Sequence, residues 1–198
     1  MGKVLAVITA SIDGYITGPH DGPGKGLGEN GERLHNWVFG GPWRYGDEMR
    51  PSAAGEDAAW LAQATANLGA VVAGRNTYEA ARHWGDRNPW GVPFFIVTHH
   101  PDQQPDGGEF IFVDGVQPAV QRAVEAADDK DVHVMGGADT IRQALTAGIV
   151  DAFTLIVAPV ILGTGKQLFD GFSQSLDLQQ VGVRQSQFAT FVDYRVRG

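Results

Sequence analysis

The sequence predicts an α/β fold: a mostly parallel sheet covered by helices on both faces, with an antiparallel pair at one edge. Short apolar runs alternate with helix-like segments through the middle of the chain, which is the pattern of βα units. The last part of the chain alternates apolar and polar residues with a period of two, as an antiparallel hairpin does. With 43% hydrophobic residues the chain has enough apolar surface for a folded core. We therefore expect one domain over residues 1–198.

The first half of the chain is expected to hold two strands and two helices. Residues 3–10 are apolar except for Lys3 and Thr9, and they predict a buried central strand. Residues 56–67 are rich in Ala, Leu and Gln, carry acids in the first turn, and predict a helix. Residues 69–74 predict a short buried strand, and residues 75–83 a second helix. Between these elements, residues 11–55 look irregular, and the glycine cluster at 18–31 suggests mobility.

The second half continues the alternation. Residues 93–98, 110–113, 132–135 and 152–160 predict strands, while residues 118–127 and 138–147 predict helices. The tail segments 176–184 and 187–196 predict the closing hairpin.

Composition excludes several classes of function. The formal net charge of −8 argues against binding to nucleic-acid phosphates or to an anionic membrane. The absence of cysteine excludes disulfides, thiolate metal sites and cysteine nucleophiles. Apolar runs are too short to span a bilayer, and the start of the chain does not read as a signal peptide. We therefore expect a cytoplasmic protein with no nucleic-acid or membrane partner and no bound metal.

Two strand–glycine–helix junctions carry the chemical signal. The first runs through residues 71–77 (VVAGRNT), and the second through residues 132–140 (VHVMGGADT). A helix N-terminus offers unpaired N–H groups, and glycine lets a phosphate approach them. A single junction of this kind is more often a plain tight turn, but two of them favour a dinucleotide, bound at the carboxyl edge of the sheet. The chain lacks the glycine spacing of a Rossmann fingerprint, a P-loop or a nucleophile elbow.

The junctions, taken with three further motifs, resemble the dihydrofolate reductase-like superfamily. In order, the motifs are residues 11–16 (SIDGYI), 74–79 (GRNTYE), 135–137 (MGG) and 158–165 (APVILGTG). The resemblance is closest to the reductase domain of the bifunctional riboflavin-biosynthesis deaminase–reductase and its stand-alone relatives, and it covers residues 3–196. It implies a three-layer fold with an eight-stranded mixed sheet, binding of NADPH, and a homodimer.

The resemblance also implies which residues contact the cofactor. The second junction would hold the pyrophosphate, the first would lie near the adenosine phosphates, and the end of the third strand would lie beside the adenine ribose. The end of the first strand and the loops at residues 13–17 and 162–163 would surround the nicotinamide. The implied cofactor contacts are Ala10, Ser11, Ile16, Gly74, Arg75, Asn76, Thr77, Thr98, His99, Gly136, Gly137, Ala138, Asp139, Thr140 and Leu162.

For the substrate, the candidates are Asp13, Trp37 and Trp60, and the candidate catalytic acid is Asp57. Asp57 and Trp60 match the acid-x-x-Trp spacing of folate reductases, although an acid in a first helical turn also simply complements the helix dipole. The aromatic cluster around Trp37 walls a substrate pocket, anchors a loop or forms a dimer contact. Met135 stands where the riboflavin-pathway reductases carry a substrate-binding acid.

Together with the two junctions, the resemblance implies an NADPH-dependent reductase that transfers a hydride to a small planar heterocycle of pterin, pyrimidine or flavin type. The alternative is a protein that keeps the fold and the nucleotide site but binds its ligand without turnover.

Overall fold

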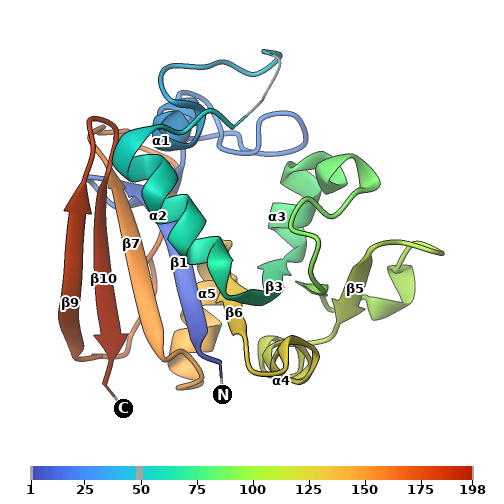
Figure 1. Cartoon of the computed structure of the whole chain (residues 1–198). Helices are drawn as coiled ribbons and strands as arrows, with labels where there is room; N and C mark the ends of the chain where they lie inside the picture. The colour runs from blue at the N-terminus through green and yellow to red at the C-terminus, as the bar shows by residue number, and fades with distance from the viewer. Residues whose placement is uncertain (1, 48–50, 198) are drawn as a thin grey trace.

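The computed structural model describes residues 2–47 and 51–197, and an eight-stranded sheet forms its centre (Figure 1). The order of strands across the sheet is β5-β4-β3-β6-β1-β7-β10-β9. Every pairing from β5 to β7 is parallel, and β10 is antiparallel to both of its neighbours, which confirms the predicted mixed sheet and closing hairpin. Its strands are β1 (Val4–Ser11), β3 (Leu68–Gly74), β4 (Phe94–Val97), β5 (Phe110–Val113), β6 (Asp131–Val134), β7 (Ala152–Ala158), β9 (Leu178–Gln185) and β10 (Thr190–Val196).

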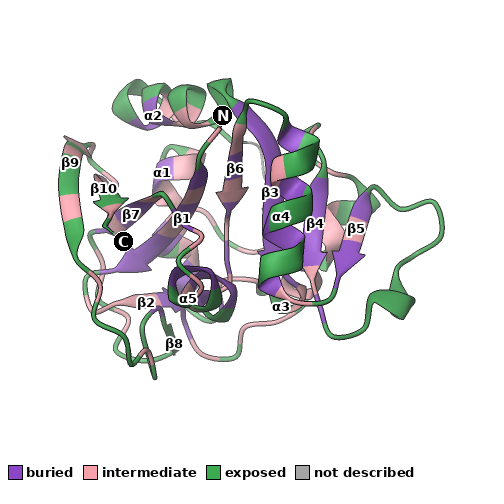
Figure 2. Ribbon diagram, turned by 90° about the horizontal axis from the view of Figure 1, so that it is seen from below, coloured by how far each residue is buried: buried purple, intermediate pink, exposed green. Residues whose placement is uncertain are grey.

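Helices cover both faces of this sheet. On one face lie α4 (Val116–Ala127) and α5 (Ala138–Thr146), and on the other lie α2 (Gly55–Ala66) and α3 (Arg75–Ala80). Figure 2 shows the exposed outer side of α4 above strands that are buried along their length. A short 3-10 helix, η3 (Pro101–Gln103), follows β4. Among the described residues no helix is long and apolar enough to cross a bilayer.

The two faces pack differently, because the apolar core is continuous on one side only. Under α4 and α5 a single cluster runs across β1, β3 and β6, and it includes Ala6, Val72 and Val134. On the opposite face the apolar residues form two clusters. One, around Tyr78, covers β3, β4 and β5, and the other, around Trp60, covers β7 and β10. Strand β6 lies between the regions that these two clusters cover, so this face has a gap over the centre of the sheet.

The segment expected to be irregular, residues 11–55, contains defined elements in its described part, which leaves out residues 48–50. Strand β2 (Tyr15–Thr17) pairs with β8 (Lys166–Gln167), and a 3-10 helix, η1 (Gly31–His35), leads into α1 (Asn36–Phe39). The glycine cluster between them is a hydrogen-bonded loop in which Gly18 N–H donates to Leu27 O at 2.8 Å and Glu29 N–H donates to Pro19 O at 2.8 Å. Gly28 has a φ of +72°, and a Cβ there would collide with the backbone of Gly18. Glycine therefore permits close packing in this loop rather than mobility alone.

The second helix is shorter than predicted. It ends at Ala80, and the five residues 82–86 of the following turn, η2 (Arg82–Asp86), all have positive φ. Such a left-handed run is costly for residues with a side chain. Side-chain contacts hold the turn in place: His83 stacks on Tyr78 with ring centroids 4.3 Å apart and bonds Glu79 at 2.8 Å. The change from right-handed to left-handed backbone conformation at this turn leaves no trace in the hydrophobic periodicity of the sequence.

Candidate functional site

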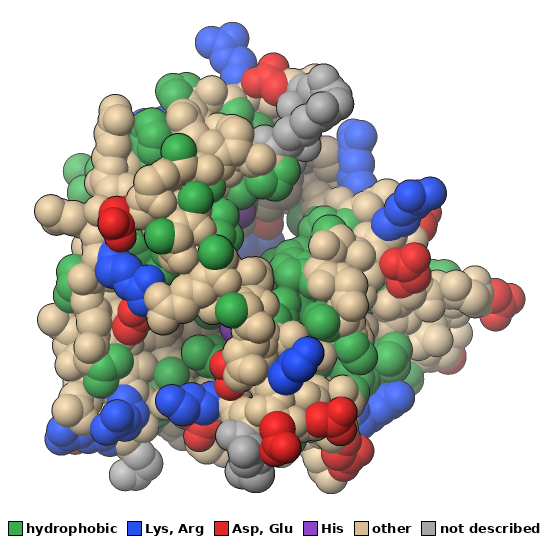
Figure 3. All heavy atoms as spheres, in the orientation of Figure 1, with side chains coloured by type: hydrophobic (Ala, Val, Ile, Leu, Met, Phe, Trp, Pro, Cys, Tyr) green, Lys and Arg blue, Asp and Glu red, His purple; other side chains and the backbone are tan. Residues whose placement is uncertain are grey.

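A cavity of about 1610 Å³ occupies the gap over the centre of the sheet. Figure 3 shows a hollow in the middle of the molecule with hydrophobic side chains on its walls. The lining comes from the carboxyl ends of β1, β3 and β6, from α2, α3 and α5, and from the loops after β2 and β4. One end of the cavity is therefore bounded by helix N-termini and the other by aromatic side chains.

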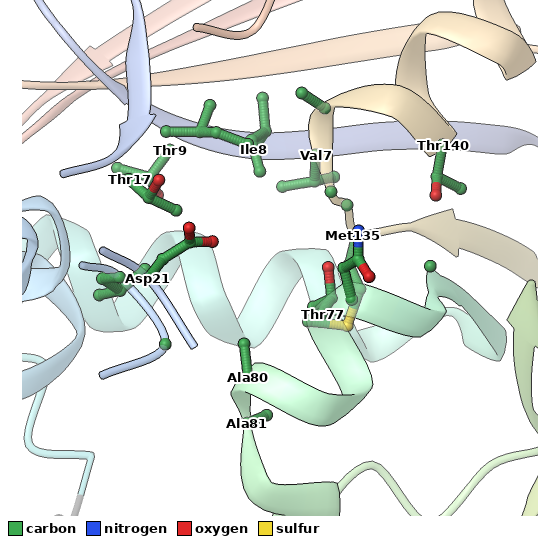
Figure 4. A pocket seen from close by; sticks show the side chains of 18 of the residues that line it. Val7, Ile8, Thr9, Thr17, Asp21, Thr77, Ala80, Ala81, Met135 and Thr140 are labelled. Carbon is green, nitrogen blue, oxygen red and sulfur yellow. The ribbon is translucent and has the colours of Figure 1, made fainter. Parts of the chain in front are cut away.

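The start of α5 forms the polar end. Gly137 is the N-cap residue and makes no side-chain hydrogen bond to the helix, so the first N–H groups of α5 have no capping side chain. The Gly136–Gly137 peptide is cis. Thr140, in the first turn, is 5% exposed and lines the cavity (Figure 4). Unpaired N–H groups and a hydroxyl at the positive end of a helix suit an anion.

The start of α3 lies directly beside it. Gly74 N–H donates to Gly136 O at 2.8 Å, which joins the two glycine junctions. A Cβ at Gly74 would stand 2.5 Å from Thr140 Oγ1, and a Cβ at Gly137 would stand 3.4 Å from Thr77 Oγ1. Both glycines therefore keep open a narrow space between two threonine hydroxyls. The sequence predicted two anion-ready junctions, and the structure brings them together.

Arg75 adds positive charge at this end. Its Nε donates to Glu79 Oε1 at 2.6 Å, and its guanidinium lies 4.7 Å from the centroid of the Phe112 ring. The hydrogen bond from His83 and the contact with Arg75 lower the pKa of Glu79, so this carboxylate stays charged. Nη1 of Arg75 is buried without a hydrogen-bond partner among the described residues. An anion in the cavity is a suitable acceptor for this orphaned donor.

The other end of the cavity is aromatic. The Trp37 and Trp60 rings meet edge to face at 5.5 Å, and Trp37 Nε1 donates to Thr9 Oγ1 at 3.2 Å. Burial lowers the pKa of nearby His35 to about 4, so this imidazole is neutral at pH 7. Trp43 packs against Tyr45, whose hydroxyl donates to Gly28 O and accepts from Leu27 N–H. The aromatic residues thus both wall the cavity and anchor the glycine loop, which are two of the three roles that the sequence left open.

One ion pair lies on the cavity wall between these ends. Lys166 Nζ and Asp21 Oδ2 are 2.6 Å apart, and both residues line the cavity. In Figure 4 the Asp21 side chain lies close to Thr17, below the β1 residues Ile8 and Thr9. The pair joins β8 to the loop after β2, and so fixes the wall formed by the β2–β8 ribbon.

Asp13 lies outside the cavity and binds the backbone. Its carboxylate accepts hydrogen bonds from the N–H groups of Leu162, at 3.1 Å, and Gly163, at 2.7 Å. The Ser11 hydroxyl and these two N–H groups lower the pKa of Asp13 to about 2. Both oxygens of Asp13, which the sequence suggested as a substrate contact, thus hold the loop after β7.

Asp57 also lies outside the cavity lining. Its side chain is 3% exposed, bonds the Ser186 hydroxyl at the tip of the β9–β10 hairpin, and has one oxygen without a partner among the described residues. Burial raises the pKa of this carboxyl group. The acid-x-x-Trp spacing does place Asp57 one turn before Trp60, but only Trp60 reaches the cavity.

Most of the remaining sequence-predicted residues meet at the cavity. The lining includes Ile16, Trp37, Trp60, Gly74, Arg75, Asn76, Thr77, Thr98, His99, Gly136, Gly137, Ala138, Asp139 and Thr140. Ala10, Ser11 and Leu162 do not line it. Ala10 and Ser11 are 3% exposed, and the Ser11 hydroxyl accepts from Tyr15 N–H. In the part of the chain that the structure describes, no three His, Asp or Glu side chains form a metal-binding group.

Sequence reasoning missed several lining residues. Asp21 and Lys166 are far apart in sequence, and nothing in the pattern pairs them. Trp84 and Trp90 come to the cavity because the left-handed turn redirects the chain after α3. His133 did carry a signal, since it is a polar residue within an otherwise apolar strand.

Comparison with known proteins gives a consistent picture. A family model described as the RibD C-terminal domain matches residues 2–190. The uncharacterised Bacillus subtilis protein YyaP is 42% identical over 55 residues, which are 28% of this chain and 29% of YyaP. The matched stretch thus spans less than a third of that relative.

Two solved structures resemble the whole chain. One is a Shewanella protein provisionally assigned to riboflavin biosynthesis, with a TM-score of 0.71, 19% identity and 99% of each chain covered. The other is dihydrofolate reductase from Enterococcus faecalis in complex with NADP(H), with a TM-score of 0.57, 16% identity, and coverage of 100% of this chain and 98% of the other. At these identities the likeness shows the fold, which is that of the dihydrofolate reductase-like proteins.

Proposed function

The chain belongs to the RibD C-terminal domain family, and on that premise we propose that it is an NADPH-dependent reductase of a small planar heterocyclic substrate. The observation that carries the proposal is the paired start of α3 and α5. Two glycines, two threonine hydroxyls and uncapped helical N–H groups converge there on one end of a large cavity. Such a cradle suits the pyrophosphate of a dinucleotide.

Each part of the cavity has a role in this proposal. Gly136, Gly137 and the first turn of α5 through Thr140 hold the pyrophosphate, and Arg75 with its neighbours on α3 holds the adenosine phosphates. Thr98 and His99 lie beside the ribose. The nicotinamide end lies towards Ile16 and the aromatic walls at Trp37 and Trp60. The bound cofactor supplies the hydride, while the protein binds and orients the two ligands and excludes water.

A binding measurement tests the cofactor part of the proposal. NADPH and NADH are titrated separately while the fluorescence of the tryptophans is recorded, because indole rings line the cavity. We expect saturable binding of NADPH well below 1 mM. If neither dinucleotide binds below about 1 mM, the proposed function is wrong.

A second candidate function is ligand binding without turnover. It is favoured by one observation: Asp57, the expected acid, does not line the cavity. Incubation with dihydrofolate, pterin and flavin substrates at saturating NADPH separates the two candidates. Oxidation of NADPH that depends on any one of these substrates supports the enzyme, and its absence with all of them supports the binding protein.

The proposal includes the organisation of the protein: one domain over residues 1–198, a homodimer and a cytoplasmic location. Support for the dimer comes from β9, an edge strand on which Val181 and Val183 are 54% and 52% exposed. Unpaired strand edges with apolar side chains favour association. Sedimentation equilibrium at micromolar concentration, with Val183→Lys as the variant, tests whether the dimer forms and whether this strand takes part.

A further inference from the structure

The centre of the cavity floor is an imidazole. His133 lies in β6, which pairs in parallel with β1 on one side and with β3 on the other. Its neighbours Val132 and Val134 point to the continuous core under α4 and α5 and are almost fully buried, so His133 points to the opposite face, into the cavity. Central strands of parallel sheets are normally apolar on both faces. A histidine at this position therefore calls for an explanation.

Contacts with the rest of the protein do not explain why a histidine occupies this position. The two apolar clusters on this face draw their buried members from β3, β4, β5, β7 and β10 and from α1, α2 and α3, and none of those members comes from β6. The ring of His133 makes no hydrogen bond to any described residue, and the charge that acts on its pKa is that of Asp131, on the same strand. Partial burial lowers the pKa of His133, so the ring is neutral at pH 7 with one N–H donor and one acceptor free.

The walls above His133 are apolar and largely aromatic. We define the indole chamber as the part of the cavity whose floor is Val7, Val71 and His133. Its walls are Trp60, Leu61 and Ala64 of α2 on one side, and Trp84 and Trp90 on the other. The two wall indoles on the second side meet edge to face at 5.3 Å, so they present a fixed surface.

The volume allows a second ligand here. The whole cavity measures about 1610 Å³, whereas sites for single ligands are typically 300–1,000 Å³. We expect a dinucleotide on the two glycine junctions to leave room over His133, because Val7, Val71, Trp84 and Trp90 line the cavity but belong to neither helix start. The chamber then offers flat apolar walls and one neutral hydrogen-bonding ring.

From this geometry we infer that the indole chamber binds an uncharged, flat, conjugated carbonyl compound, whose carbonyl oxygen accepts a hydrogen bond from His133. The inference rests on the proposed function in one respect: this compound would be the substrate that receives the hydride. Indole side chains on both walls suit a flat ring, and a carbonyl oxygen suits the imidazole N–H. A charged ligand would leave its charge without a partner among these walls.

Binding of paired probes tests the inference without requiring turnover. Menadione is a neutral conjugated diketone, and 2-methylnaphthalene has the same ring frame without the oxygens. Their affinities are measured by calorimetry for the wild type and for His133→Leu, with thermal melting as the check on folding. We expect the wild type to prefer menadione roughly fivefold to tenfold, the effect of one neutral hydrogen bond, and the variant to lose that preference while still binding 2-methylnaphthalene.

Three results would overturn the inference: no binding of either probe, equal binding of the two probes by the wild type, or an unchanged preference in His133→Leu. If His133→Leu does not fold, the preference of the wild type for menadione still tests the inference. A second variant, Ala64→Leu, fills the chamber from α2 and should abolish binding of both probes. A third probe, 1,4-naphthoquinone-2-sulfonate, should bind at least tenfold more weakly than menadione, and equal binding would refute the uncharged class.

The outcome is separable from that of the proposed function. If dinucleotides bind but menadione does not, the chamber inference fails and the proposed cofactor site stands. If menadione binds through His133 but dinucleotides do not, the chamber is a ligand site and the reductase proposal fails.

Discussion

Asp13 and Gly163 are 150 residues apart in the sequence, yet Asp13 Oδ2 accepts a hydrogen bond from Gly163 N–H at 2.7 Å. The same carboxylate binds Leu162 N–H, and two further backbone bonds, Ile12 N–H to Val160 O and Leu168 N–H to Gly14 O, surround this contact. The turn between β1 and β2 is thus fastened to the connection between β7 and β8. Because β2 and β8 form one wall of the cavity, Asp13 determines the position of that wall from outside it.

The variant Asp13→Asn tests this role. An asparagine keeps one acceptor but turns an N–H₂ group towards a backbone N–H, so one of the two bonds is lost. We expect amide hydrogen exchange at Leu162 and Gly163 to become at least tenfold faster. The exposed Asp102, at the start of η3, provides the control Asp102→Asn, which should leave these amides unchanged. Unchanged exchange in Asp13→Asn would show that the loop is held by its other contacts.

The pair of glycines at the helix starts leads to a second prediction. At Gly137 the backbone is extended, so valine is tolerated there, but its side chain would enter the space beside Thr77 Oγ1. We expect Gly137→Val to fold and to weaken NADPH binding at least tenfold. Gly22→Ala is the matched control, because its Cβ meets no atom within 4 Å. Wild-type affinity in a folded Gly137→Val variant would remove this glycine from the site.

Arg75 gives a third prediction, on cofactor preference. Its unpaired Nη1 is the one orphaned guanidinium donor recorded among the described residues, and NADPH differs from NADH by one phosphate. Charge-assisted hydrogen bonds contribute about 1.5–3 kcal/mol. We expect Arg75→Met to weaken NADPH binding roughly 10-fold to 100-fold and NADH binding much less, and Arg75→Lys to restore part of the difference. Equal losses for the two dinucleotides would mean that Arg75 does not contact the distinguishing phosphate.

His35 predicts how stability depends on pH. The pKa of this buried ring is about 4 in the folded protein and 6.5 as its ordinary value. Between these values the unfolded chain binds a proton that the folded chain does not, so the free energy of unfolding decreases as the pH falls from 6.5 to 4. The full effect is at most about 3 kcal/mol, because a pKa difference of one unit corresponds to about 1.4 kcal/mol.

Chemical denaturation at several pH values checks this. The variant His35→Gln should show a flatter pH profile, whereas His100→Gln, at an exposed histidine, should keep the wild-type profile. A profile unchanged in His35→Gln would indicate that His35 is protonated in the folded state as readily as in the unfolded chain.

The sequence predicted the fold in detail because its signals were local. Apolar runs such as residues 3–10 and 69–74 mark buried strands, and the glycine junctions mark where helices begin. Strands β2 and β8 were not predicted because they contain three and two residues, too few to show a period. The end of α3 was misjudged because the reversal of hand at residues 82–86 depends on contacts with Tyr78 and Glu79.

For the candidate site, the residues at the helix starts could be predicted from the sequence, whereas the surroundings of the acids could not. Residues on the helix starts, such as Thr77 and Thr140, follow directly from their position in a βα junction. The partners of Asp13 and Asp57 could not be predicted in the same way, because a carboxylate within a motif can point to either side of its element. Asp13 turns to the backbone of a distant loop, and Asp57 turns to Ser186 on the hairpin. Such partners are set by tertiary packing, which sequence spacing does not contain.

Asp57 gives the last prediction, since its placement outside the cavity has measurable consequences. Burial raises the pKa of its carboxyl group, so the folded protein holds the proton more tightly than the unfolded chain does. Charging Asp57 at neutral pH therefore reduces the free energy of unfolding, and the reduction disappears as the pH falls through the raised pKa. We expect Asp57→Asn to be more stable than the wild type at pH 7, and the gain to shrink as the pH falls towards the ordinary pKa of an aspartate. Affinity for NADPH should stay within about twofold of the wild-type value, because Asp57 does not line the cavity. The opposite pattern, a loss of substrate-dependent NADPH oxidation with unchanged stability, would mean that Asp57 takes part in the chemistry as the sequence motif suggests.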